Sequence, residues 1–151
     1  MIKTIAIAAV SALALASAAQ AADANSGADA PLPPTFIVYK LAQDGIPLRK
    51  LKAEGGIYEA RVEATDGSIV KVGIDPQTAE LTDAYSHARP RQADGAAPKV
   101  DAAQAIQAVA ATGYWDIREI EFEKGGWEVK ARNDDGRRAK FIVDAVSGQV
   151  R

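Results

Sequence analysis

The clearest pattern in the chain is an alternation of apolar and charged residues near its C-terminal end. Residues 127–132 read WEVKAR, with every second residue apolar. This period of two is typical of a strand with one buried face. Asp135-Gly136 follows, and the glycine supplies the positive φ of a tight hairpin. The alternation resumes at residues 139–143 (AKFIV), and an earlier stretch, residues 117–123, has the same form, so three strands are expected.

A helical pattern precedes these strands. Asp101 is suited to cap a helix, and Gln104 three residues later completes a capping box. The apolar residues that follow share one helical face: Ala102, Ile106, Val109 and Ala110. Gly113 is a natural stop. A helix this short is marginal in isolation, so its apolar stripe is expected to pack on the sheet.

The same order of elements occurs once before. Residues 58–81 align with residues 127–150 at a constant shift of 127 − 58 = 69 positions, without a gap. A helix is expected over residues 35–44, with Val38, Leu41 and Ala42 on its apolar face, and strands are expected to follow it. An internal period decides architecture before any local feature does. The chain is therefore predicted to be α+β, with two tandem repeats, each one helix packed on a three-stranded antiparallel sheet. Whether the repeats share one sheet is left open.

The ends and joints of the chain have a different composition. Residues 5–16 form a short apolar run behind Lys3, and Ala19-Gln20-Ala21 resembles a signal-peptidase site. The run is shorter than a membrane span needs. Proline and small polar residues then dominate two stretches that separate the folded parts. The predicted segments are a signal peptide (1–21), a disordered leader (22–34), repeat 1 (35–83), a linker (84–99) and repeat 2 (100–151). A periplasmic or secreted location follows.

Charge and composition exclude several classes of function. The signal segment contains one lysine and no acid, so the exported part carries 17 − 20 = −3. This balance gives no reason to expect nucleic acid or an anionic membrane as partner. The chain has no cysteine, which excludes thiol chemistry and thiolate metal sites. No membrane span is expected after signal cleavage.

Both repeats resemble the PepSY family. The resemblance rests on a "YEV"-like strand, an Asp-Gly hairpin and a strand ending in V-D-x-x-[ST]-G-x-[VIL]. Repeat 2 has these as residues 126–129 (GWEV), 135–136 (DG) and 143–150 (VDAVSGQV). Repeat 1 matches through residues 57–60 (IYEA), 66–67 (DG) and 74–81 (IDPQTAEL), where Ala79 replaces the family's glycine. The resemblance implies an exported, non-catalytic regulatory or inhibitory binding module. The tandem arrangement is also similar to the beta-lactamase inhibitory protein fold, a likeness of fold only.

Some acidic and histidine positions suggest chemistry, but each has a simpler interpretation. Asp75 and Asp144 occupy the same place in both repeats, where each is expected to bind the amides of its own turn rather than form a catalytic pair. His87 is the single histidine and lies in the linker, without further nitrogen or sulfur ligands nearby. A strand bearing Glu119, Glu121 and Glu123 on one face could attract calcium. A solvated acidic stripe is the expected outcome, and no metal or other cofactor is predicted.

Basic and aromatic residues offer candidate contacts. Basic residues outside the strand alternation are interpreted as scattered and solvated: Arg89, Arg91, Lys99, Arg137 and Arg138. Tyr114 and Trp115 follow Gly113 and are the candidate contacts to a partner, because tyrosine and tryptophan are common at interface centres. Packing alone is the alternative for both rings.

Two hypotheses remain. A third, a hydrolase, would need a carboxylate pair or a nucleophile triad that the sequence does not supply, so no enzyme activity is predicted. The first is an exported PepSY-type module that binds another envelope protein or peptide and inhibits a protease or regulates its partner. It would use a sheet face or a strand edge. The second is an envelope sensor for a small ligand or cation, suggested by the acidic stripe and by a cleft expected between the repeats. The partner's identity and the oligomeric state do not follow from the sequence.

Overall fold

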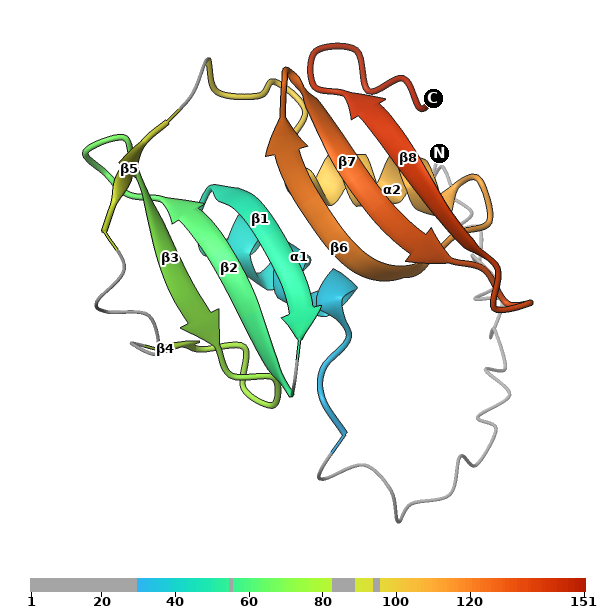
Figure 1. Ribbon diagram of the computed structural model, residues 1–151, viewed down its shortest axis with the longest axis horizontal. Helices are drawn as coiled ribbons and strands as arrows, with labels where there is room; N and C mark the ends of the chain where they lie inside the picture. Colours follow the sequence, from blue (N-terminus) through green and yellow to red (C-terminus); the bar gives the residue numbers. More distant parts are fainter. Residues whose placement is uncertain (1–29, 55, 83–88, 94–95) are drawn as a thin grey trace, which may run out of the picture.

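The computed structural model describes residues 30–54, 56–82, 89–93 and 96–151. The predicted signal segment and His87 lie outside these residues. The described elements follow one another as α1 (Pro34–Gln43), β1 (Leu48–Glu54), β2 (Ile57–Glu63), β3 (Ser68–Ile74), β4 (Leu81–Thr82), β5 (Arg91–Gln92), α2 (Ala102–Ala110), β6 (Asp116–Glu123), β7 (Gly126–Arg132) and β8 (Arg138–Asp144) (Figure 1). The predicted α+β class is confirmed.

One antiparallel sheet runs through both halves of the chain, in the order β4-β3-β2-β1-β6-β7-β8, and β5 pairs with β3. The two halves join where β1 pairs with β6. The question left open by the sequence is thereby answered: the repeats share one sheet, and the arrangement of one helix on its own three-stranded sheet in each repeat is not confirmed. β1 and β6 would each have been an edge strand, and pairing them removes two rows of unpaired backbone groups.

The junction is nearly symmetric. Leu51 pairs with Ile120, and these residues correspond under the repeat shift, since 51 + 69 = 120. On either side, Lys50 pairs with Glu121 and Lys52 with Glu119. The first strands of the two repeats thus meet at equivalent positions with opposite charges. Two copies of β6 meeting in the same register would place glutamate against glutamate, so the charges favour pairing between unlike strands.

Both helices cover the same face of the sheet, behind the strands in the view of Figure 1, and they contact each other. The core lies between helices and strands, and its fully buried members include Ile37, Leu51, Ile120, Trp127 and Val143. The Trp127 indole donates a hydrogen bond to the carbonyl oxygen of Val100 at 2.7 Å. In the described part of the chain, no helix is long and apolar enough to cross a membrane.

The helix details depart slightly from the predicted apolar faces. The Asp101–Gln104 capping box is present, as predicted. In α1, however, Ala42 is exposed and Ile37 is buried, and in α2 Ala110 is exposed and Ala105 is buried. The buried stripes are therefore shifted around each helix. A stripe that includes Pro34, Ile37, Val38 and Leu41 faces the sheet in α1.

The segment before α1 contacts repeat 1. The Leu32 amide donates to the Pro76 carbonyl at 2.6 Å, and the Tyr58 hydroxyl donates to the Leu32 carbonyl. Tyr58 is buried, as are Ala60 and Val62 on the same face of β2. These bonds connect the start of the described chain to the end of β3.

Candidate functional site

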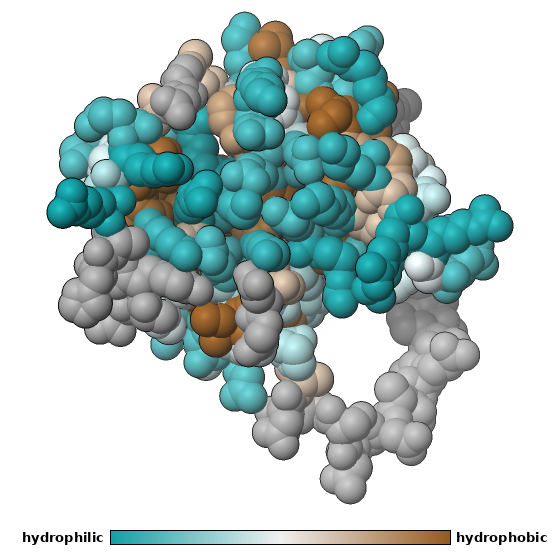
Figure 2. Space-filling model, in the orientation of Figure 1, coloured by the Kyte–Doolittle hydropathy of each residue, from teal (hydrophilic) through white to brown (hydrophobic). Residues whose placement is uncertain are grey.

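Hydrophilic side chains cover most of the outer face of the sheet, which is the face opposite the helices (Figure 2). At the junction, the Lys50 Nζ atom lies 2.6 Å from a Glu121 oxygen and 3.3 Å from a Glu119 oxygen. Lys130 Nζ reaches Glu119 at 2.8 Å, and an Arg61 nitrogen reaches Glu121 at 3.3 Å. Glu119 and Glu121 are thus neutralised by cations of neighbouring strands, which corrects the expectation of a solvated acidic stripe.

Electrostatics at Glu119 follow from this arrangement. Burial acts to raise the pKa of Glu119, but the hydrogen bonds and charges of Lys130 and Lys50 outweigh it and lower that pKa. The hydrogen bond to Glu119 in turn raises the pKa of Lys130. Within the described ranges, no three acidic or histidine side chains gather into a set that could hold a metal ion.

Asp75 and Asp144 bind the amides of their own turns. Asp75 Oδ1 accepts from the amides of Gln77 and Thr78 at 2.7 and 3.0 Å. Asp144 Oδ1 accepts from the amides of Val146 and Ser147 at 3.0 and 2.8 Å. These backbone bonds lower the pKa of both carboxyl groups. The repeated aspartates therefore have the structural role expected of them.

The two candidate contact residues have different environments. Tyr114 is partly buried, and its ring meets Phe141 edge to face at a centroid distance of 5.1 Å. Trp115 is 53% exposed, although its indole nitrogen donates to an Asp134 oxygen at 3.0 Å. Tyr114 is thus largely a packing residue. Trp115 is an exposed ring with a hydrogen bond to the hairpin between β7 and β8.

A closed ion pair occupies one corner of repeat 1, at the end of the β1–β2 ladder and beside repeat 2. Arg49 on β1 is buried, and its Nη2 and Nε atoms lie 2.5 and 3.0 Å from one oxygen of Glu63 on β2. The Arg49 guanidinium also lies over the Phe122 ring, 4.9 Å from its centroid. The charge of Arg49 is therefore satisfied within the protein by a carboxylate and an aromatic face.

The equivalent corner of repeat 2 has an arginine in place of the Glu63 carboxylate. The shift of 69 residues places Arg118 at the position of Arg49 and Arg132 at the position of Glu63. Arg118 is exposed, with one Asp116 oxygen at 3.4 Å. The Arg132 Nε atom is shielded from solvent and has no hydrogen-bond partner among the described residues. An arginine pair thus stands where repeat 1 has an ion pair.

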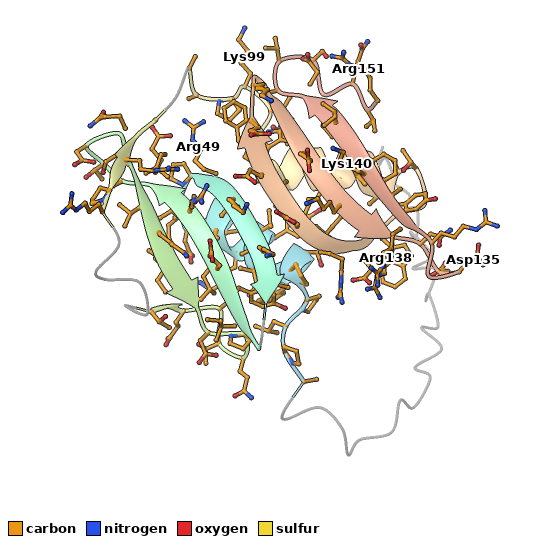
Figure 3. The ribbon with its side chains drawn as sticks, viewed as in Figure 1. Arg49, Lys99, Asp135, Arg138, Lys140 and Arg151 are labelled. Atoms are coloured by element: carbon orange, nitrogen blue, oxygen red, sulfur yellow. The ribbon has the colours of Figure 1, made fainter. Side chains whose placement is uncertain are left out.

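Further cations surround Arg132. Across the β7–β8 ladder, Arg138 faces Arg132 and Lys140 faces Lys130. A hollow of about 400 Å³ lies among these side chains and Arg118. We call this group the cationic corner: Arg118, Lys130, Arg132, Arg138 and Lys140. Arg138 lies nearer than Lys140 to the hairpin that carries Asp135 (Figure 3).

Sequence reasoning did not find the cationic corner. It treated Arg138 as one of several scattered basic residues, and it assigned Lys130 and Arg132 only to a polar sheet face. The available signal was the substitution of Glu63 by Arg132 between the repeats, read together with the pairing of β7 and β8.

Two grooves lie elsewhere. One, of about 610 Å³, is lined by residues 96–99, by Phe122 and by the loops around Lys124 and Val146. The other, of about 340 Å³, lies where both repeats meet and includes Val38, Ala42, Ala102 and Ala103. Sites of this size can take small ligands. The lining of the second groove also includes Arg49, Glu63 and Asp101.

A family model described as "Peptidase propeptide and YPEB domain", PepSY, matches residues 4–85 and again residues 86–151. The search of curated proteins and the search of solved structures found no match. The two matches account for nearly the whole chain and divide it between the repeats, in agreement with the doubled motifs. The chain belongs to the PepSY family, as a tandem-domain member.

Proposed function

We propose that this protein is an exported, non-catalytic module that binds an envelope protein and regulates or inhibits it. Membership of the PepSY family supports the proposal, because the family suggests a propeptide-like or inhibitor-like module. Domains of this family are typically extracellular or periplasmic. The signal-like residues 1–21 agree with that location.

The observation that carries the proposal is the environment of Trp115. A ring that is 53% exposed leaves a large apolar surface in water, and its indole nitrogen donates to Asp134. Tryptophan has only two side-chain torsions and therefore loses little conformational entropy on binding, which is one reason why it anchors interfaces. Arginine, the other residue type enriched at such anchors, is present in the neighbouring cationic corner.

Site-specific photocrosslinking tests the proposal. A photoreactive phenylalanine analogue replaces Trp115 in one variant, and in a control variant it replaces Phe36, a similarly exposed ring (47%) on α1. Both variants are expressed in the source organism. We expect a discrete adduct with one envelope protein from position 115 and none from position 36. Absence of an adduct at position 115, or the same adducts at both positions, would contradict the proposal.

A second candidate function is a sensor for a small ligand, favoured by the groove between the two repeats. Val38 and Ala42 from α1, with Ala102 and Ala103 from α2, contribute to its lining. A ligand bound only by the folded state must raise the melting temperature. A panel of apolar metabolites, with calcium, zinc and copper as the cation arm, would discriminate between the candidates. Unchanged melting temperatures across the panel would remove this candidate.

A further inference from the structure

The two outer edges of the sheet differ in how far other segments of the chain cover them. In repeat 1 the edge strand is β3, and the chain itself covers both of its ends. β4 pairs with Gly73 and Ile74, and β5 pairs with Ser68 and Ile69. Such short cover strands prevent an edge from pairing with another chain.

In repeat 2 the edge strand is β8, and its cover is partial. Ile142 exchanges two backbone hydrogen bonds with Arg151, at 2.9 and 2.8 Å. Because backbone groups alternate in direction along a strand, Arg138 and Lys140 direct theirs toward the same outer edge. No described residue pairs with that part of β8. By the repeat shift, Arg138 corresponds to Ile69, one of the residues that β5 covers.

The open part of the edge coincides with the cationic corner. Arg138 and Arg132 are directly opposite each other, as are Lys140 and Lys130, and like charges so placed repel. Lys130, Lys140 and Arg118 each have a carboxylate neighbour, in Glu119, Glu128 and Asp116 respectively. Arg132 and Arg138 have no ion pair within the described residues. Asp116, which lies opposite Arg132 across the β6–β7 ladder, is the carboxylate that pairs with Arg118. Among the described residues, Arg132 and Arg138 are thus the cations of this corner without an ion pair, and Arg138 lies on the open part of the edge.

We propose that an extended acidic segment of a partner protein adds as a strand to the outer edge of β8 beside Arg138 and Lys140. Carboxylates at alternate positions of that segment would lie over the outer face and pair with Arg138, Lys140 and, behind them, Arg132. The segment would take the place that β5 takes in repeat 1. This inference rests on the proposed function and assigns its binding site.

The combination favours a peptide over other anions. A strand edge offers backbone donors and acceptors, which only another backbone satisfies in register. The chain's own charge is weakly negative, −2 over all residues, which disfavours a long polyanion. Trp115 adds an apolar contact at the hairpin end of the same site, since Asp134 in the β7–β8 hairpin holds its indole.

Calorimetric titration with defined peptides tests the inference. The full chain is expressed with its own export segment, and the purified product is titrated with an eight-residue peptide that alternates glutamate and threonine. Three matched probes follow: the same peptide with glutamine for glutamate, the glutamate peptide with methylated backbone nitrogens, and inorganic phosphate. We expect the glutamate peptide to bind at least about tenfold more tightly than any of them, and to bind more weakly as salt rises.

Variants locate the site. Arg132→Met with Arg138→Met should lower affinity for the glutamate peptide at least about tenfold. Arg137→Met, an exposed arginine outside the hollow, is the control and should leave affinity unchanged. Melting temperatures show that each variant is folded. The double variant is expected to fold, because Arg132→Met removes a nitrogen that is shielded from solvent and has no hydrogen-bond partner among the described residues. This substitution should raise the melting temperature.

Several results would overturn the inference. Equal binding of the glutamate and glutamine peptides would exclude charge recognition, and equal binding of the methylated peptide would exclude strand addition. Phosphate binding as tight as that of the peptide would make this an oxyanion site. If the Trp115 crosslink is found but the glutamate peptide does not bind, this inference fails alone. If no crosslink is found, the proposed function fails.

Discussion

The equivalent corners of the two repeats contrast a closed site with an open one. In repeat 1, Arg49 and Glu63 neutralise each other, and the Arg49 guanidinium lies over Phe122. In repeat 2, Arg118 and Arg132 occupy the same positions, and the Arg132 Nε atom has no hydrogen-bond partner among the described residues. The same backbone therefore carries an ion pair in one copy and two arginines in the other. A duplicated fold can keep one copy for stability and use the other for binding, because proteins tolerate unfavourable local charge mainly at functional sites.

The edges of the sheet repeat this contrast. β5 covers the first residues of β3, whereas the first residues of β8 are uncovered in the described part of the chain. Ile46 corresponds to Trp115 under the repeat shift and is partly buried, whereas Trp115 is exposed. The unpaired arginines, the uncovered part of the β8 edge and the exposed Trp115 ring all occur in repeat 2. Each of these features is consistent with a binding site in that repeat.

Exchanging the corner residues should give the largest effect. Glu63→Arg places two arginines in the corner of repeat 1 and leaves the buried Arg49 unpaired, so we expect a loss of about 3 kcal/mol in the free energy of unfolding. Arg132→Glu gives Arg118 the partner that Arg49 has, and should add up to about 1 kcal/mol. Urea denaturation measures both. Equal losses from the two substitutions would show that the corners do not differ as described.

The junction between the repeats should be the next most sensitive place. Lys50 is largely buried between Glu119 and Glu121, so Lys50→Gln removes the charge that both carboxylates share. We expect a loss of about 1–2 kcal/mol by urea denaturation. Lys40→Gln is the control, because its pair with Asp44 is exposed and should matter by less than about 0.5 kcal/mol. A loss in the free energy of unfolding no larger than that of the control would show that the charges at the junction do not stabilise the fold.

Two substitutions in equivalent turns are expected to change stability by smaller amounts and in opposite directions. Ala79 has φ 61° and Gly148, its equivalent, has φ 73°, a backbone conformation that glycine adopts without strain. Ala79→Gly should therefore stabilise and Gly148→Ala destabilise, each by about 1 kcal/mol. A new methyl group at position 148 would meet Val100 only at an ordinary 3.7 Å. Thermal melts that shift both variants in the same direction would contradict this account of the turns.

The smallest effect concerns pH and the turn aspartates. Asp75 and Asp144 have lowered pKa values in the folded protein because backbone amides donate to them. The pKa of aspartate in an unfolded chain is about 3.9. The stabilisation is therefore fully present above that pH and is lost as the pH falls through the folded-state values. Carboxyl titration by NMR should place both below the unfolded value, and Asp144→Asn should flatten the pH dependence. A normal pKa at either position would contradict the assigned hydrogen bonds.

The sequence predicts most of the local structure because its signals are local. The capping box at Asp101, the Asp-Gly hairpins and the buried rows at Tyr58 and Trp127 depend on spacing alone. The pairing of β1 with β6 cannot be predicted from spacing, because it depends on which strand edges meet in space. The cationic partners of Glu119 and Glu121 could not be predicted for the same reason. The cationic corner needed the same knowledge, because Arg132 and Arg138 become neighbours only across the β7–β8 ladder.

An NMR titration with the glutamate peptide tests the central claim most directly, because it observes both repeats in one experiment. The account predicts amide shifts at Arg138 and Lys140 and a shift of the Trp115 indole. Their counterparts in repeat 1, Ile69, Lys71 and Ile46, should stay unchanged. Equal shifts in both repeats, or shifts confined to the groove between the helices, would contradict the division of one closed and one open corner.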